Sequence, residues 1–303
     1  SSCEVIISLA GGHLDSGDNR VVSICLTDDA PSWILRHPPS SSVAFDVAYN
    51  ADGLPASRHT YQHSHYIPSL DRVMHLGARA VYGNARDFTS VDGFSLATNR
   101  WDPKGTWTDI TAGYGAGLVK ATGVVYATSL QKWTPTGAGL WTNPISTRTE
   151  DLVRWPIAHD TSRDQLFTLQ WGDGQGYDSD RGVQSTRVPL SGSAQHKVTF
   201  KPSEAYTQFQ ADQPTYAAMD YEPNIDQFFF YCGIGSGAGR IYVIKPNESS
   251  IWEMGILPLA AGSITPTQVP SAGVNNRFRY VPALKGFVLL AAASSNLFFI
   301  RTS

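Results

Sequence analysis

Cysteine, methionine, charge and long apolar runs are all scarce in this chain of 303 residues. Cysteine and methionine occur three times each, and charged residues make up 16% of the chain. No run of about 18 apolar residues occurs, since Ser294, Ser295 and Asn296 interrupt even the stretch 286–300, so we expect no membrane-spanning helix. The net charge of −3 and the lack of a Lys/Arg cluster argue against nucleic acid as a partner, because that binding depends chiefly on cations.

No convincing amphipathic helix is evident, and a repeated pattern dominates instead. It consists of an apolar run with near period-two alternation, a short turn, a second apolar run and a tryptophan. Its three copies are 20–33, 90–101 and 240–252. Alternation of this period is typical of β-strands.

A second recurring element lies upstream of the first. It is a strand, a tight polar turn and an apolar strand that ends in Gly or Ala, with Pro, Asn, Asp or Gly where the chain reverses. Its copies are 66–77, 159–170, 221–233 and 280–291, with a weaker copy at 117–126 and the outgoing strand of one more at 4–12.

Together the two elements predict a single all-β domain, a six-bladed β-propeller with four-stranded antiparallel blades. A length of 303 residues allows about 50 residues for each blade, a usual size for such repeats. Plentiful glycine and aromatic residues fit many short strands joined by tight turns. The predicted domain is 1–303, with approximate blades 1–42, 57–110, 113–150, 154–200, 214–258 and 273–303 and with 43–56 as an inter-blade loop.

Three features carry a family resemblance: the turn-and-tryptophan repeat, the Gly11-Gly12 pair, and the segment 56–61 that opens another blade. With them the chain resembles the kelch and galactose-oxidase-like propellers over its full length. The resemblance implies a kelch-like propeller but no single activity, because this fold hosts enzymes, sugar binders and interaction scaffolds. The chain departs from the family pattern, since one copy keeps the double glycine and the third and sixth blades lack a clear closing tryptophan strand.

A propeller gathers loops from its blades on one face, where ligands bind. Residues just before an innermost strand, and those between the second and third strands, belong to that face. The candidate residues there are His13, Asp15, Asp18, Arg58, His59, Arg79, Arg86, Arg154, Trp155, the loop 173–180 and Arg277. From this set, we expect six residues to contact the ligand: His13, Arg58, His59, Arg79, Trp155 and Asp178.

The segment 58–65 is the densest part of this candidate site. In a strand, alternation would point four side chains to one side, namely His59, Tyr61, His63 and His65. Imidazoles suit zinc, copper or manganese, which makes His59, His63 and His65 the candidate metal ligands. Same-face residues lie about 6.6 Å apart, so a donor from another blade, such as His13 or Asp160, would be needed. The alternative is that these histidines line the channel or serve a structural role.

The same segment also suits a metal-free enzyme. His59 or Tyr61 would abstract a proton beside a carboxylate that Arg58 and Arg79 neutralise, as in lyases acting on uronic-acid polysaccharides. These four residues are the catalytic candidates. The alternative is that both arginines pair with nearby carboxylates such as Asp52 and Asp87.

Other motifs carry weaker signals. Copper-radical oxidase chemistry is not indicated, because alternation sends the adjacent Tyr231 and Cys232 to opposite faces. The acidic loop 172–180 offers oxygen ligands for calcium but also has the composition of a solvated turn. The glycine-rich loop 233–239 lacks the helix and the acidic residue of a dinucleotide site, and Asn247 begins a glycosylation sequon by pattern only.

The cysteines and tryptophans leave structural alternatives open. Cys3 and Cys25 fall in one blade and could form a disulfide in an oxidising compartment, whereas Cys232 and these two could all be buried free thiols. The repeat positions predict packing between blades for Trp33, Trp101 and Trp252. The tryptophans outside the repeat are candidates for exposure: Trp107, Trp133, Trp141, Trp155 and Trp171.

We therefore expect an extracytoplasmic propeller that binds a glycan or a protein partner through one loop face. The motifs assign no cofactor, and calcium or a transition metal stays open as an alternative. The first residue lies close to a strand, as in a mature or trimmed product. The alternatives are a carbohydrate-active enzyme of the lyase type and a structural component of a virion or surface appendage. The natural ligand and the oligomeric state stay open.

Overall fold

The computed structural model describes most of the chain. The described residues are 4–8, 17–44, 46–78, 88–109, 116–127, 131–142, 156–172, 179–192, 194–264, 273–291 and 296–302. Two compact units divide the chain: Ser1–Tyr114 with Leu118–Asn143, and Gly115–Gly117 with Pro144–Ser303.

Three sheets belong to the first unit, and in each of them chain neighbours pair antiparallel. The first sheet contains β1 (Glu4–Ser8), β2 (Val21–Cys25) and β3 (Ile34–His37). The second contains β4 (Ser64–Ile67), β5 (Arg72–Ala78), β6 (Phe88–Ser95) and β7 (Arg100–Trp101). The third contains β8 (Ala116–Val119), which crosses the boundary between the units, β9 (Val124–Ala127), β10 (Gln131–Thr134) and β11 (Leu140–Thr142).

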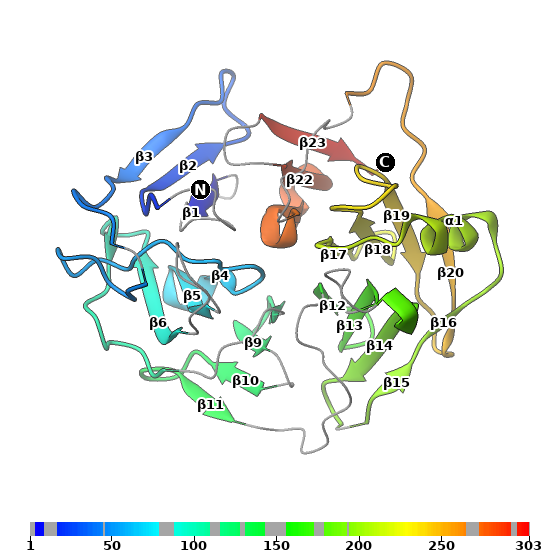
Figure 1. Cartoon of the computed structure of the whole chain (residues 1–303), viewed down its shortest axis with the longest axis horizontal. Coiled ribbons are helices and arrows are strands. Elements are labelled where there is room, and N and C mark those ends of the chain that lie inside the picture. The colour runs from blue at the N-terminus through cyan, green and yellow to red at the C-terminus, as the bar shows by residue number, and fades with distance from the viewer. Residues whose placement is uncertain are drawn as a thin grey trace. The chain divides into compact units, whose positions relative to one another are not determined.

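The second unit also holds three sheets, and in Figure 1 the strands β12, β13, β14 and β15 of one sheet follow one another outward. Their bounds are β12 (Ile157–Asp160), β13 (Gln165–Trp171), β14 (Val183–Pro189) and β15 (His196–Lys197). The next sheet has β17 (Ala218–Glu222), β18 (Gln227–Tyr231), β19 (Ile241–Lys245), β20 (Ile251–Ile256) and β16 (Thr199–Phe200). The last has β21 (Phe278–Val281), β22 (Gly286–Leu290) and β23 (Leu297–Arg301).

The predicted strand-turn-strand element is confirmed in four copies. Each copy reverses through a residue with left-handed backbone, at Asp71, Asp164, Asp226 and Lys285, with φ between 47° and 54°. Two of these turns have the same local structure, since the 3₁₀ turns η1 (Pro68–Leu70) and η6 (Pro282–Leu284) both begin with proline and end on the left-handed residue. Proline fixes the φ that the first turn position requires, so the sequence dictates this reversal.

Strand β18 shows how neighbouring sheets pack. Four of its five residues are buried, because alternation sends them into two different cores. Phe228 and Phe230 pack against the sheet that contains β13, whereas Phe229 and Tyr231 pack against the sheet that contains β22. An apolar run without polar alternation is therefore what a strand between two sheets requires.

One edge strand from each of the three sheets in the second unit lies next to that of the following sheet, β12 beside β17 and β17 beside β21. Small meandering sheets that pack face to face in this way are propeller blades. The chain is therefore an all-β propeller. The expectation of uniformly four-stranded antiparallel blades is wrong, because the described sheets have three, four or five strands and β16 pairs with β20 in parallel. Phe200, expected at the end of the fourth blade, thus belongs to the following sheet.

One helix forms although the sequence shows no convincing amphipathic pattern. Helix α1 (Glu204–Asp212) lies in the connection before β17. Its signals are local: the Ser203 side chain accepts a hydrogen bond from the backbone N–H of Tyr206, and Gln213 ends the helix in left-handed conformation. Nine residues are too few for a clear apolar period, although Phe209 is fully buried. None of the helices in the described ranges is long and apolar enough to cross a membrane.

The tryptophan predictions are partly correct. Trp101 and Trp252 are buried as expected, but Trp33, directly before β3, is 42% exposed. Trp107 and Trp133, candidates for exposure, are buried, and their rings pack with centroids 6.2 Å apart. Trp141 and Trp171 are half-buried, and Trp155 lies outside the described residues.

Candidate functional site

Arg58, the central residue of the predicted site, is engaged inside the protein. Its side chain is 1% exposed, and one terminal nitrogen lies 2.5 Å from the carboxylate of Asp92. The guanidinium also donates to the backbone carbonyls of Ser90 and Ala48, each at 3.0 Å. Asp92 pairs with Arg58 instead of the Asp52 that the sequence suggests. Arg58 therefore ties the connection before β4 to strand β6.

Tyr49 and His75 complete this buried polar cluster. The Tyr49 hydroxyl donates to Asp92 at 2.9 Å, and burial, followed by the negative charge of Asp92, raises the Tyr49 pKa to about 12. Burial, followed by the positive charge of Arg58, lowers the pKa of His75 to about 3. His75 is therefore neutral at ordinary pH, and the cluster holds one balanced ion pair.

The histidine-rich segment is not the strand that alternation requires. Strand β4 begins only at Ser64, and Tyr61 has a left-handed φ of 42° in a turn. The prediction that four side chains point to one side therefore loses its geometric basis. His63 is fully buried, its Nδ1 lies 2.8 Å from the carbonyl oxygen of Leu76, and burial lowers its pKa to about 4.

His59 and His65 are buried as well, and the His59 ring contacts the Tyr61 ring edge-on at a centroid distance of 5.9 Å. Within the described ranges, no three His, Cys, Asp or Glu side chains gather closely enough to hold a metal ion. The metal set His59, His63 and His65 thus has no described cluster to support it.

The other candidate residues are dispersed or undescribed. Asp18 forms an ion pair with Arg20 at the surface. Arg277 donates to the backbone carbonyls of Gly273 and Val274. Tyr231 and Cys232 are buried in the second unit. The candidates that lie outside the described residues are His13, Asp15, Arg79, Arg86, Arg154, Trp155, Asp173 and Asp178.

Of the two cysteine interpretations, the structure favours the disulfide. Cys25 is disulfide-bonded, whereas Cys232 is a buried free thiol. Burial raises the pKa of the Cys232 thiol to about 12, so this group is unreactive in the folded protein. Cys3 lies outside the described residues.

A cleft in the first unit opens beside β7, and its residues were not among the predicted ones. Its volume is about 660 Å³, within the range of about 300 to 1,000 Å³ that is usual for small-molecule sites. The residues that line it are Arg72, Ser95, Thr98, Arg100, Trp101, Asp102 and Pro103. They come from the start of β5, the end of β6, the turn that follows it, β7 and the segment after β7. No single local sequence motif therefore identifies them.

Asp102 organises the wall of this cleft. Its Oδ2 accepts hydrogen bonds from Arg72 Nε and Trp107 Nε1, both at 2.8 Å. Arg72 also donates to the carbonyl oxygen of Leu70 at 2.8 Å, so its guanidinium is held in place. The pKa of Arg72 is raised, first by the hydrogen bond to Asp102.

Gly93 permits this arrangement. A Cβ atom at position 93 would lie 2.5 Å from the Asp102 carboxylate and 2.8 Å from Trp107 Nε1. The backbone N–H of Asp102 donates to the Gly93 carbonyl at 2.8 Å. The glycine is thus required for the close approach of β6 to the wall of the cleft.

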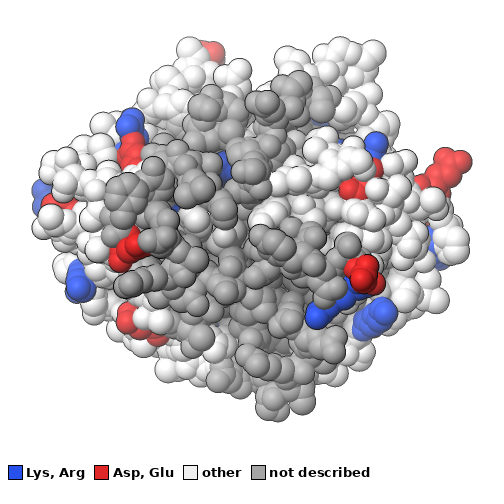
Figure 2. Space-filling model, viewed as in Figure 1, with Lys and Arg blue, Asp and Glu red and all other residues white. Residues whose placement is uncertain are grey.

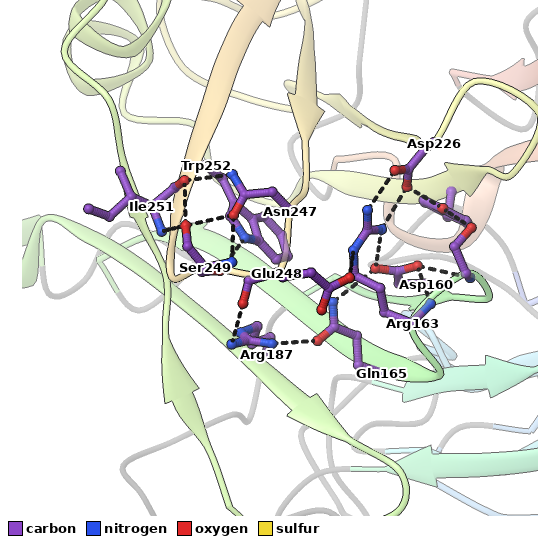
Figure 3. A network of polar contacts seen from close by, with 12 residues as sticks. Asp160, Arg163, Gln165, Arg187, Asp226, Asn247, Glu248, Ser249, Ile251 and Trp252 are labelled. Carbon is purple, nitrogen blue, oxygen red and sulfur yellow. Dashed lines mark hydrogen bonds and ion pairs between the residues drawn. The ribbon is translucent and has the colours of Figure 1, made fainter.

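A second polar network, in the second unit, joins two adjacent sheets (Figure 3). Arg163, in the turn after β12, donates to both carboxylate oxygens of Asp226 at 2.7 and 2.6 Å. The same guanidinium contacts Asp160 at 3.1 Å. Hydrogen bonds to Asp226 and then Asp160 hold the pKa of Arg163 above its usual range. Because the Arg163 guanidinium is shared between carboxylates of both sheets, this network stabilises the packing of the two sheets.

Charge on the described surface is sparse. Figure 2 shows isolated groups of Lys or Arg and of Asp or Glu on the described part of one face, with no broad region of one sign. This sparse distribution agrees with the small share of charged residues in the chain, 16%.

Comparisons with known proteins show similarity in fold alone. An auxiliary nutrient binding protein from Bacteroides thetaiotaomicron superposes with a TM-score of 0.46 and 8% identity, covering 93% of this chain and 71% of that one. The periplasmic gluconolactonase of Pseudomonas aeruginosa superposes with a TM-score of 0.45 and 12% identity, covering 98% and 81%. No protein-family model and no curated protein matches the chain, so kelch membership stays a prediction.

Proposed function

We propose that this propeller is a binding module for a glycan, and that the cleft beside β7 is its binding site. One observation carries the proposal: a concavity of about 660 Å³ combines guanidinium, carboxylate and hydroxyl groups with the small exposed part of Trp101. Several hydrogen-bonding groups around a small apolar contact suit a sugar, which carries many hydroxyls.

A binding role fits the predicted loop-face residues better than a lyase. A lyase built on Arg58 needs its guanidinium to reach the carboxylate of a substrate. Arg58 instead contacts Asp92 and two backbone carbonyls while almost completely buried. Release of that guanidinium would leave Asp92 as an unpaired buried charge, which is strongly unfavourable.

An extracytoplasmic location is part of the proposal. The disulfide at Cys25 supports it, because disulfides persist in oxidising compartments and are rare where glutathione keeps thiols reduced.

The test is a glycan array probed with the purified protein and with two tryptophan variants. Thr98→Trp places an indole at an exposed position in the cleft and should abolish binding. Thr161→Trp, at an exposed turn position in the second unit, is the matched control and should bind like the parent protein. Absence of any bound glycan, or binding that Thr98→Trp leaves unchanged, would refute the proposal.

A further inference from the structure

We infer that the cleft binds an acidic sugar, with the carboxylate of a uronic acid on Arg100. This inference rests on the proposed function, because it names the class of glycan that the same cleft takes.

The balance of charge in the cleft is the first argument. Arg72 and Arg100 bring two guanidinium groups to the lining, and Asp102 brings one carboxylate. That carboxylate already accepts hydrogen bonds from Arg72 and from Trp107. In the described part of the chain, exposed Arg100 forms neither an ion pair nor a side-chain hydrogen bond. One positive charge is therefore in excess, and it lies on Arg100.

The groups around Arg100 are the second argument. A guanidinium binds a carboxylate through two parallel N–H donors, a geometry that neutral sugar hydroxyls do not match. The Ser95 hydroxyl oxygen accepts the backbone N–H of Thr98 at 3.4 Å, which leaves its hydrogen to donate to a ligand. Thr98 adds a second, exposed hydroxyl. The cleft thus offers several donors around the place of the excess charge.

The experiment measures the affinity of three forms of the protein for trigalacturonate and for neutral galactotriose by calorimetric titration. Arg100→Gln removes the excess charge and should weaken trigalacturonate binding about tenfold or more, because a charge-assisted hydrogen bond is lost. Arg301→Gln removes another exposed guanidinium, in β23, and should change the affinity less than about twofold. Binding of trigalacturonate should also weaken as salt rises.

The outcomes separate the inference from the proposed function. If galactotriose binds as tightly as trigalacturonate, or Arg100→Gln has no effect on either sugar, the acidic-sugar inference is overturned while glycan binding stands. If neither these sugars nor any array glycan binds, the proposed function fails and the inference fails with it. Thermal unfolding of Arg100→Gln should match the parent protein, because Arg100 is exposed.

Discussion

The guanidinium of Arg58 lies 2.5 Å from the carboxylate of Asp92, and both side chains are at most 3% exposed. Their residues are separated by β4 and β5 in the chain, so the pair fixes the connection before β4 onto β6. Taking two charges out of water is expensive, and the structure offsets this with the hydroxyl of Tyr49 and the carbonyls of Ala48 and Ser90. Removal of one partner of such a buried pair strongly destabilises a protein, because the other charge stays buried without a partner.

Arg58→Met should therefore destabilise the protein by about 3 to 5 kcal/mol, because it leaves Asp92 buried without a counter-charge. Urea unfolding measures the loss. The double variant Arg58→Met with Asp92→Leu should recover much of it, because no charge then stays buried. A single variant as stable as the parent protein would show that Arg58 is free to serve a ligand.

Buried neutral histidines predict a loss of stability in acid. The folded pKa values of about 4 for His63 and about 3 for His75 lie below the ordinary value of 6.5. Below about pH 6.5 the unfolded chain binds protons that the folded protein does not, so stability is fully present above that pH and falls toward pH 4. The free energy of unfolding should change by up to about 1.4 kcal/mol per pH unit for each histidine.

Unfolding free energies at a series of pH values test this slope. His63→Gln retains a side-chain donor for the Leu76 carbonyl but does not titrate, so it should flatten the slope between pH 4 and 6.5. His196→Gln changes an exposed histidine and serves as the control. Equal slopes in all three proteins would contradict the assignment.

Gly93→Ala should destabilise the protein by about 1 to 3 kcal/mol, because the new methyl group overlaps Asp102 and Trp107. It should also weaken ligand binding in the cleft, since Asp102 holds Arg72. Thermal unfolding and glycan titration measure the two effects. Gly192→Ala, where an added Cβ meets no atom within 4 Å, is the matched control and should change stability by less than about 0.5 kcal/mol.

The pair of Arg163 and Asp226 predicts a smaller effect. Asp226→Asn should destabilise by about 1 kcal/mol, because the Asp226 side chain is 42% exposed and solvent screens the pair. Arg163→Lys keeps the charge but loses the two parallel donors, so it should also cost stability. Chemical denaturation of the two variants and of their combination gives the coupling. Strict additivity would mean that the two side chains do not interact in solution.

The sequence predicts the fold through patterns that are local. The hairpin copies at 66–77 and 221–233 carry their turn residues and apolar strands within a dozen positions, so they can be recognised without the rest of the chain. Trp33 has the same repeat position as Trp101 but is 42% exposed, whereas the Trp101 ring packs against His75 and Phe94. That difference depends on what packs against the strand, which the local pattern does not contain.

The site is harder to predict for the same reason. The clustering of His59, His63 and His65 is a sequence fact, but the left-handed turn at Tyr61 breaks the alternation that would make it a site. Arg72 and Asp102 stand 30 positions apart and meet only because β5, β6 and β7 pair. Polar residues flank Trp101 in the sequence, but the repeat pattern alone predicts packing for this segment and no binding site.

Hydrogen–deuterium exchange with and without trigalacturonate tests the location of the binding site most directly. The proposed cleft predicts that the bound sugar slows exchange in the segment 95–103, with little change in the histidine-rich segment 58–65. Protection confined to 58–65, or to any part of the second unit, would contradict the central claim that this propeller binds its ligand beside β7.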